Sequence, residues 1–122
     1  MNATTTSPRT GALWLIKITT GVLLIVILVI HLTVNHMIGS ASGLLTYSEV
    51  VSYYQNWIVP IMEILFLVFV VTHALLGLRN IYLDFNPSKR ALQTVNWLLV
   101  VFGAGFIIYG TWLVFQILQL GS

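Results

Sequence analysis

The sequence predicts an all-α membrane protein with three transmembrane helices and a short interfacial helix in the outer loop. Its 122 residues are 58% hydrophobic and only 7% charged, whereas a soluble domain carries roughly 25% charged residues. Three apolar stretches, at about residues 12–38, 57–83 and 95–118, each exceed the ~20 residues that a helix needs to cross a hydrocarbon layer of ~30 Å. We therefore expect a single membrane domain over residues 1–122.

Local signals support each helix in turn. The residues before the first helix, 1–11, are polar and lack the basic and short apolar regions of a signal peptide, so this helix is expected to be retained. Asn86 and Pro87 end the second helix, because the residue before a proline disfavours helical backbone. In the third helix, Gly103 and Gly110 form a small-residue face that favours close packing.

The loop between the first two stretches, residues 39–56, is expected to contain the short helix. Apolar and aromatic residues recur in it at helical spacing: Leu44, Leu45, Tyr47, Val50, Val51 and Tyr54. Tyrosines suit the boundary between membrane and water. This helix is therefore expected to lie on the outer surface and to serve in packing.

The basic residues predict how the chain is oriented in a cell's inner (cytoplasmic) membrane. Arg9 and Lys17 flank the start of the first helix, and Arg79, Lys89 and Arg90 surround the loop between the second and third. The other loop has no Lys or Arg. Because short loops rich in Lys and Arg stay inside, the N-terminus is expected in the cytoplasm.

Composition excludes several kinds of function. The chain has no cysteine, so it cannot hold a disulfide, a zinc–thiolate site or an iron–sulfur cluster of its own. A net charge of +2 is too small to indicate nucleic-acid binding. Lipid is the environment that this composition fits.

Polar groups inside the apolar stretches are the candidates for chemistry, because each is costly in a bilayer and is usually paired or functional. They are Lys17, His31, Asn35, His36, Glu63, His73, Asn80 and Asp84. At ~100° per residue, Lys17, Thr20, His31 and Asn35 share one face of the first helix. His73, Gly77, Asn80 and Asp84 share one face of the second, whereas His36 faces elsewhere.

An intramembrane histidine with a glycine one turn away, as in His73 and Gly77, is typical of an axial haem ligand. The alternative is a histidine hydrogen-bonded between helices or acting as an isolated proton relay. At ~1.5 Å per residue, His31 and His73 lie roughly 10 Å apart in depth, too far to bind one iron easily. If both are ligands, they serve two haems, and each haem needs a second histidine from another chain.

The segment His73-Ala-Leu-Leu-Gly77-Leu-Arg79-Asn80-Ile-Tyr82-Leu-Asp84 resembles the second-helix signature of succinate dehydrogenase cytochrome b anchors. The first helix resembles that family too, through Trp14, Lys17, Thr20, Gly21 and His31, with Lys17 where Arg is commoner. The Ser-Pro-His and Ser-x-x-His-Arg segments of the C-type anchor are absent. The resemblance therefore implies a D-type subunit of the class with two anchors and two haems.

This resemblance implies that the chain is a non-catalytic, haem b-binding subunit of a succinate:quinone oxidoreductase. Its partners would be a second, C-type anchor, an iron–sulfur subunit and a flavoprotein subunit. It would dock the last two and help to form the electron path and the quinone site. Two haems would be shared with the second anchor, and quinone would be the substrate.

The resemblance also implies roles for particular residues. His73 and His31 would ligate haem iron, with His36 the competitor of His31 and an interhelical hydrogen bond the alternative for it. Gly77 and Lys17 would contact the haem, Lys17 through its propionates, although a lysine snorkelling to the interface fits equally.

At the inner end of the second helix, Tyr82, Arg79 and Asp84 would bind quinone by supplying a hydroxyl, a cation and a proton-exchanging carboxyl. Ordinary interface anchoring by Tyr82 and Arg79 and a helix-ending role for Asp84 are the alternatives.

Two other functions remain open from the sequence. One is a proton relay or small transporter accessory subunit that uses His31, His73 and Glu63. The other is a structural anchor without haem. Glu63 itself fits a snorkelling side chain or a bond to the partner anchor better than a proton path.

Overall fold

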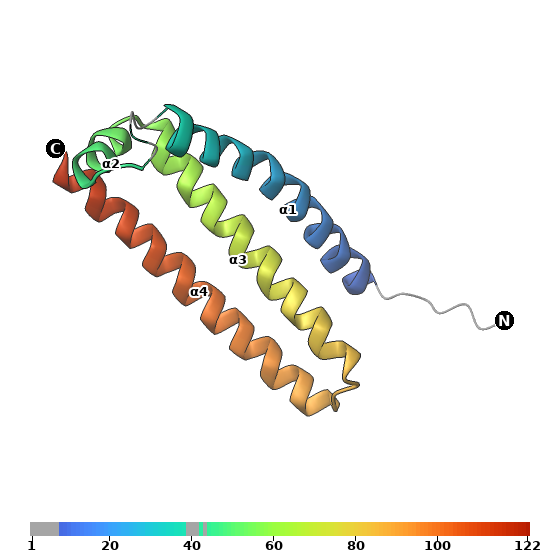
Figure 1. Cartoon of the computed structure of the whole chain (residues 1–122). Helices are drawn as coiled ribbons and strands as arrows, with labels where there is room; N and C mark the ends of the chain where they lie inside the picture. Colours follow the sequence, from blue (N-terminus) through green and yellow to red (C-terminus); the bar gives the residue numbers. More distant parts are fainter. Residues whose placement is uncertain (1–7, 39–41, 43) are drawn as a thin grey trace.

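A computed structural model describes residues 8–38, 42 and 44–122 of the chain. Within these residues the secondary structure is entirely helical (Figure 1). The elements are α1 (Pro8–Thr33), which continues into the π-helical turn η1 (Val34–Ile38), then α2 (Tyr47–Tyr54), α3 (Ile58–Asp84) and α4 (Lys89–Leu120). The predicted all-α fold is confirmed, and a short helix, α2, lies in the loop between the first two long helices. The polar head at 1–7 and the start of that loop at 39–41 and 43 lie outside the described residues.

Three helices are long and apolar enough to cross a membrane: Thr10–Ile38, Ile58–Asp84 and Lys89–Leu120. The last begins six residues before the apolar stretch that predicted it. The reason is Ser88, whose side chain accepts a hydrogen bond from the backbone N–H of Ala91 at 3.2 Å and so caps the helix. Its first turns are polar and extend beyond the apolar span.

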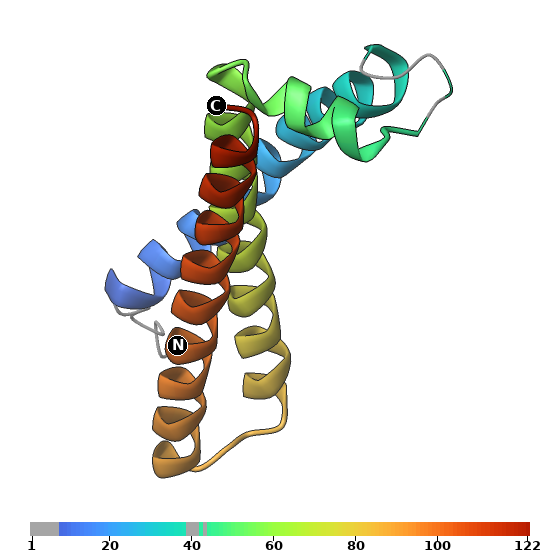
Figure 2. The ribbon, with the colours of Figure 1, turned by 90° about the vertical axis from the view of Figure 1, so that its left-hand side faces the viewer.

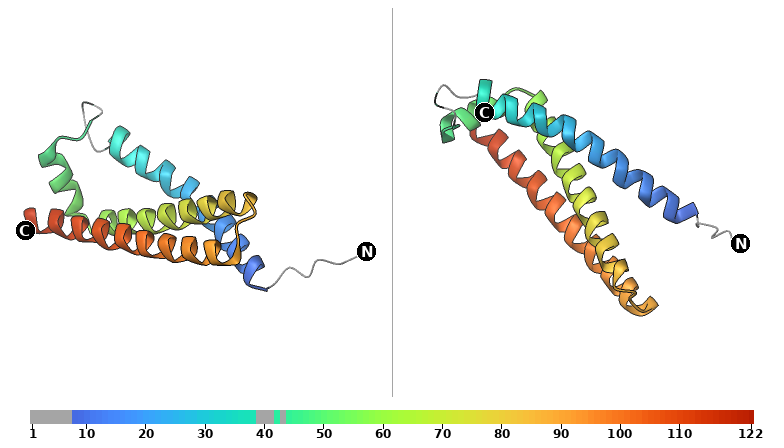
Figure 3. Two further views of the ribbon diagram at one scale, coloured as in Figure 1. Left: turned by 90° about the horizontal axis from the view of Figure 1, so that it is seen from below. Right: turned by 45° about the vertical axis from the view of Figure 1, so that its right-hand side comes forward.

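The long helices form one layer with α3 in the middle (Figure 1). α3 and α4 run side by side in opposite directions, and α1 crosses α3 at a marked angle (Figures 2 and 3). α1 and α4 each pack on α3, and within the described chain the backbones of α1 and α4 do not approach each other closely. The start of α1 and the α3–α4 turn lie at one end of the layer, and α2 and the C-terminus lie at the other.

Missing side chains on α4 bring it close to α3. Gly103 is buried, and a Cβ atom there would lie 2.5 Å from Cδ1 of Leu75. At Gly110 a Cβ atom would lie 2.5 Å from Cδ2 of Leu67. Both distances are too short for real atoms, so the small-residue face predicted for the third helix is the face that packs.

The turn between α3 and α4 is short and tightly defined. The backbone N–H of Asn86 donates to the carbonyl of Leu83 at 3.0 Å, and Asn86 itself has φ 52°. Asparagine tolerates this left-handed conformation better than most residues. Pro87 and the cap at Ser88 follow at once, so the chain reverses direction within four residues, 85–88.

At the opposite end, α2 starts with a capping box. The backbone N–H of Thr46 donates to Oε2 of Glu49 at 2.7 Å, and the N–H of Glu49 donates to the Thr46 hydroxyl. The backbone N–H of Thr46, and then its hydroxyl, donate to Oε2 of Glu49 and hold the pKa of Glu49 below its ordinary value. The amide of Gln55, just after α2, donates to the carbonyl of Leu118 at 3.5 Å and so ties α2 to the end of α4.

Most of the surface is apolar and outward-facing. In the described chain the only buried residues are Thr20, Val59, Pro60, Gly103 and Val114. Large side chains such as those of Phe102 (59% exposed) and Ile108 (69%) point away from the layer. Such a surface is stable only against lipid or against other apolar helices.

Candidate functional site

Two groups of polar contacts lie between α1 and α3. One surrounds His73 and the other surrounds His31. Along α1, Thr20 at the first group and His31 at the second are 11 residues apart, which is ~16 Å at the helical rise. The two histidines therefore lie in separate groups of contacts.

His73 reaches from α3 to the backbone of α1. Its Nδ1 atom lies 3.0 Å from the carbonyl oxygen of Lys17 and 3.3 Å from the hydroxyl oxygen of Thr20. A carbonyl oxygen can only accept a hydrogen bond. The Thr20 hydroxyl already donates to the carbonyl of Ile16 at 2.7 Å, so its oxygen also acts as an acceptor toward the ring. Nδ1 of His73 therefore carries the proton, and in the neutral ring Nε2 keeps its lone pair.

A glycine stands against the His73 ring, but it is Gly21 of α1. A Cβ atom at Gly21 would lie 3.0 Å from Cε1 of His73, 3.4 Å from Nδ1 and 3.9 Å from Nε2. At Gly77, one turn from His73 on its own helix, a Cβ atom would meet nothing in the described chain within 4 Å. Gly21 thus seats the ring, whereas Gly77 leaves open space on α3.

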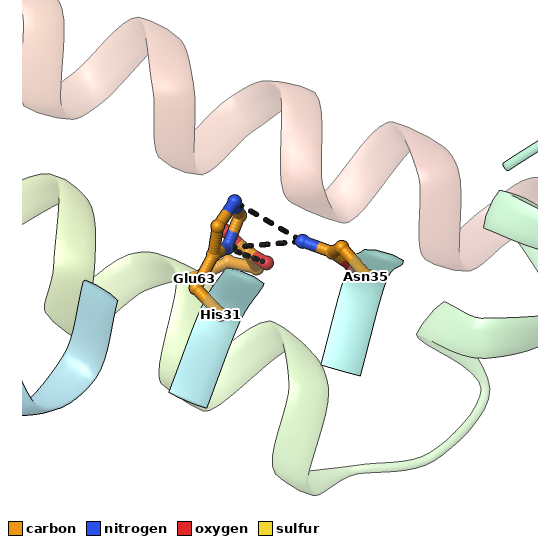
Figure 4. A network of polar contacts seen from close by, with 3 residues as sticks. All are labelled: His31, Asn35 and Glu63. Atoms are coloured by element: carbon orange, nitrogen blue, oxygen red, sulfur yellow. Dashed lines mark hydrogen bonds and ion pairs between the residues drawn. The ribbon is translucent and has the colours of Figure 1, made fainter. Parts of the chain in front are cut away.

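His31 belongs to a closed group with Asn35 and Glu63, which we call the His31 cluster (Figure 4). Nδ1 of His31 lies 3.0 Å from Oε1 of Glu63 on α3 and forms an interhelical ion pair when the ring is charged. The ring also stacks on Phe66, with centroids 5.2 Å apart. The interhelical hydrogen bond that was the alternative for His31 is therefore present.

Both ring nitrogens of His31 are engaged within this cluster. The nitrogen of the Asn35 amide lies 3.1 Å from both ring nitrogens, and because Nδ1 donates to the Glu63 carboxylate, the amide donates to the lone pair on Nε2. If the amide is turned over, its oxygen accepts from a protonated Nε2 instead. In either arrangement Nε2 of His31 has a partner. The two histidines thus differ: Nε2 of His31 has a hydrogen-bond partner, whereas the hydrogen bonds of His73 described above involve Nδ1.

A cavity of about 290 Å³ lies beside the His31 cluster, between η1, α2 and α3. His36, which is exposed, Tyr53 and Tyr54 complete its polar lining. The Tyr53 hydroxyl is buried without a hydrogen-bond partner in the described chain. Burial, and then the charge of Glu63, raises the pKa of Tyr53 and takes the pKa of Tyr54 to about 12. Both phenols therefore stay protonated at physiological pH.

Two basic residues line one cavity between α1 and α3. Lys17 and Arg79 line a cavity of about 200 Å³ between α1 and α3, together with Trp14 and Asn80. The same Lys17 supplies the carbonyl that holds His73. Nε of Arg79 donates to Oδ1 of Asn96 on α4 at 2.9 Å, which fixes the guanidinium at this end of α3.

The predicted quinone residues are spread around the end of α3. Tyr82 and Asp84 are two residues apart, so they point to nearly opposite sides of the helix at ~100° per residue. Asp84 is exposed as the last residue of α3, and Tyr82 is half-buried. Arg79 lies ~60° from Tyr82 and faces the cavities instead. Arg79 thus shares a cavity with Lys17 and one side of α3 with Tyr82, whereas Asp84 points to the other side.

Sequence reasoning missed some of the residues that shape these sites. Asn96, the partner of Arg79, lies near the start of the third apolar stretch, and an amide at that depth was a usable signal. Thr20 and Gly21 were noticed in the first-helix pattern without a role. The Lys17 carbonyl has no signature in sequence, because every residue carries one. Among residues 8–38, 42 and 44–122, no three His, Cys, Asp or Glu side chains gather as metal ligands.

The fold and these contacts define a small three-span membrane protein whose polar groups are gathered between its helices. Residues 3–112 match the family described as succinate dehydrogenase/fumarate reductase transmembrane subunit, and the chain belongs to this family. It is 36% identical over 110 residues to the succinate dehydrogenase hydrophobic membrane anchor subunit of Archaeoglobus fulgidus. The matched region covers 85% of this chain and 87% of that relative. No solved structure gives a significant match. The resemblance to succinate dehydrogenase anchors is confirmed.

Proposed function

We propose that this anchor binds haem b, with Nε2 of His73 as an axial ligand of the iron. The observation that carries the proposal is the bond from Nδ1 of His73 to the Lys17 carbonyl, 3.0 Å long. Metal-binding histidines almost always donate their other ring N–H to a carbonyl, carboxylate or water, which fixes the tautomer and strengthens the ligand. His73 meets this condition, and its lone pair is on the nitrogen that ligates.

The surroundings of His73 fit a haem. Lys17 and Arg79, which share one cavity, would pair with propionate carboxylates. The open space at Gly77 leaves room for a flat ring beside α3. Haem supplies one-electron transfer when it is bound. The chain's own contributions are the ligand, the cations and the apolar walls that keep water away.

A second haem with His31 as ligand stays a prediction. Ligation there would require the Asn35 amide to leave Nε2, while Glu63 would continue to accept from Nδ1. His36, the competitor, lies on the exposed side of η1. The number of haems per complex decides whether a second haem is bound in this way.

The quinone proposal rests on Arg79, Tyr82 and Asp84 at one end of α3. Besides its cavity with Lys17, Arg79 lines a mostly apolar cavity of about 470 Å³ between α3 and α4, with Leu13 of α1 at its edge, which would suit an isoprenoid tail. Tyr82 and Asp84 point to different sides, so they would act with groups from partner subunits rather than with one another. Asp84, being exposed, would exchange protons with water.

The cation-rich end of the layer would face the cytoplasm in the inner membrane. The start of α1, the α3–α4 turn and the start of α4, where Lys89 and Arg90 stand, lie together there. The iron–sulfur and flavoprotein subunits would dock at this end, and a second anchor would supply the other histidine of the His73 haem.

An absorbance spectrum of the purified complex tests the proposal. Reduction with dithionite should produce the α-band of a b-type haem, and the haem content per complex should be one or two. A single haem would assign His31 to its hydrogen bonds, and two would support it as a ligand. A complete complex without an α-band would contradict haem binding and favour a structural anchor.

A second candidate function is a proton relay at the His31 cluster. The pair of His31 and Glu63, 3.0 Å apart and beside a cavity that also holds two protonated tyrosines, favours it. This function needs no haem, so the spectrum separates it from the main proposal.

Changing Asp84 to Asn is expected to slow succinate:quinone activity by up to ~100-fold, because the amide cannot exchange a proton with quinone. Succinate oxidation with an artificial acceptor at the flavoprotein should be almost unchanged. Glu49→Gln is the matched control: Glu49 is a carboxylate at the far end of the layer, and glutamine preserves its capping box. Parent-level quinone activity in Asp84→Asn, with haem content the same, would leave Asp84 as a helix-ending residue.

A further inference from the structure

Resting on the proposed haem at His73, we infer that Thr20 and Gly21 of α1 are positioning residues for the imidazole of His73. The Thr20 hydroxyl oxygen accepts a hydrogen bond from Nδ1–H. Because Gly21 has no side chain, the ring can rest against the backbone of α1, which fixes the plane of the ring. Together they set the direction and donor strength of Nε2.

Thr20 is placed for this role by its burial and its bonds. It is only 7% exposed and is the one buried polar residue among those described. Its hydroxyl proton is donated to the carbonyl of Ile16 at 2.7 Å, with the carbonyl of Lys17 at 3.1 Å as the second acceptor, and this leaves an oxygen lone pair for the Nδ1 proton at 3.3 Å. The Lys17 carbonyl is the nearer acceptor at 3.0 Å. The Nδ1 proton is therefore shared between two acceptors from one turn of α1.

Gly21 limits how the ring can turn. A Cβ atom there would approach the edge that runs from Nδ1 through Cε1 to Nε2, with the closest approach, 3.0 Å, at Cε1. That distance is shorter than ordinary packing allows, so an added methyl group would push the ring aside or rotate it. The backbone of α1 thus forms the wall against which the ring rests.

These contacts act on the ligand itself. Donation from Nδ1–H to two acceptors makes Nε2 a stronger electron donor, which favours the oxidised iron and lowers the reduction potential. Rotation of the ring changes its overlap with the iron orbitals. A residue that only stabilised the α1–α3 packing would alter neither property at full haem content.

The experiment compares complexes that carry Thr20→Val, Thr20→Ser, Gly21→Ala or Gly11→Ala. Thr20→Val keeps the shape of the side chain and removes its oxygen, so the haem potential should shift to more positive values, and Thr20→Ser should restore the parent value. Gly21→Ala should shift the low-spin electron paramagnetic resonance signal of the oxidised haem. Gly11→Ala, the same change on the same helix where a Cβ meets nothing within 4 Å in the described chain, should do neither.

A haem-free measurement keeps this inference separate from haem binding. In haem-depleted membranes with ¹⁵N-labelled histidine, the parent should show His73 with Nδ1 protonated and Nε2 bare, and Gly21→Ala should show a mixture of tautomers. His73→Gln identifies the signals. Absence of haem with this tautomer pattern would overturn the haem proposal alone. Parent-like potential, resonance signal and ¹⁵N shifts in both Thr20→Val and Gly21→Ala would overturn the positioning roles.

Discussion

Replacing His73 with alanine is expected to remove one b-type haem from the purified complex. Haem whose iron has lost an axial imidazole is held weakly in a helix bundle. The same change also frees the Lys17 carbonyl and Thr20, which have no other partner on α3 among the described contacts. The measurement is haem content per complex together with the reduced α-band, and we expect loss of the whole contribution of that haem.

Variants of the other two histidines complete this experiment. His36→Ala should leave the haem at His73 unchanged, since His36 lies on the exposed side of η1. His31→Ala should remove a second haem if His31 is a ligand. If His31 serves only in its cluster, the variant keeps full haem content and weakens the contact between α1 and α3. Unchanged haem content and potentials in His73→Ala would contradict the ligand assignment.

Expression of the chain without its second anchor is expected to yield little protein and no stable haem. The long helices form one layer (Figure 2), and a haem held by Nε2 of His73, as proposed, would need a second histidine from the proposed second anchor, because His31 contacts Glu63 and Asn35 instead. Unassembled polar groups in a bilayer are costly. Immunoblots of membranes should show that the amount of the chain falls several-fold, because lost stability changes the abundance of a protein by such factors.

Restoring the second anchor on a separate plasmid is the control for that experiment. Chain level and haem content should then return together, whereas supplying only the flavoprotein should restore neither. Recovery of a well-folded, haem-loaded monomer from the single-anchor strain would contradict the dependence.

Hydropathy was enough to predict the three long helices, since each must satisfy its backbone alone in lipid. Asn86 and Pro87 marked the end of α3, and the structure places the reversal there. The start of α4 at Lys89 was less visible, because a capped polar turn outside the apolar span leaves no hydropathy signal.

For the site, the sequence predicted only which residues share one face of a helix. Periodicity placed His73 on a polar face, but pairing it with Lys17 and Gly21 requires the register between α1 and α3, which one sequence does not encode locally. The same holds for Glu63, whose contact with His31 on α1 also depends on that register, while a bond from Glu63 to a second anchor stays a prediction. Haem and quinone contacts depend on other chains and stay predictions.

The central position of α3 has a consequence for how the chain is made. α1 is synthesised and inserted before α3 exists, yet the partners of Thr20 and His31 are His73 and Glu63, both on α3. The short turn at 85–88 then lets α4 follow α3 into the bilayer as a hairpin. A nascent chain truncated before Ile58 therefore presents a lone helix whose polar side chains lack their partners from this chain, which is a costly state in a bilayer.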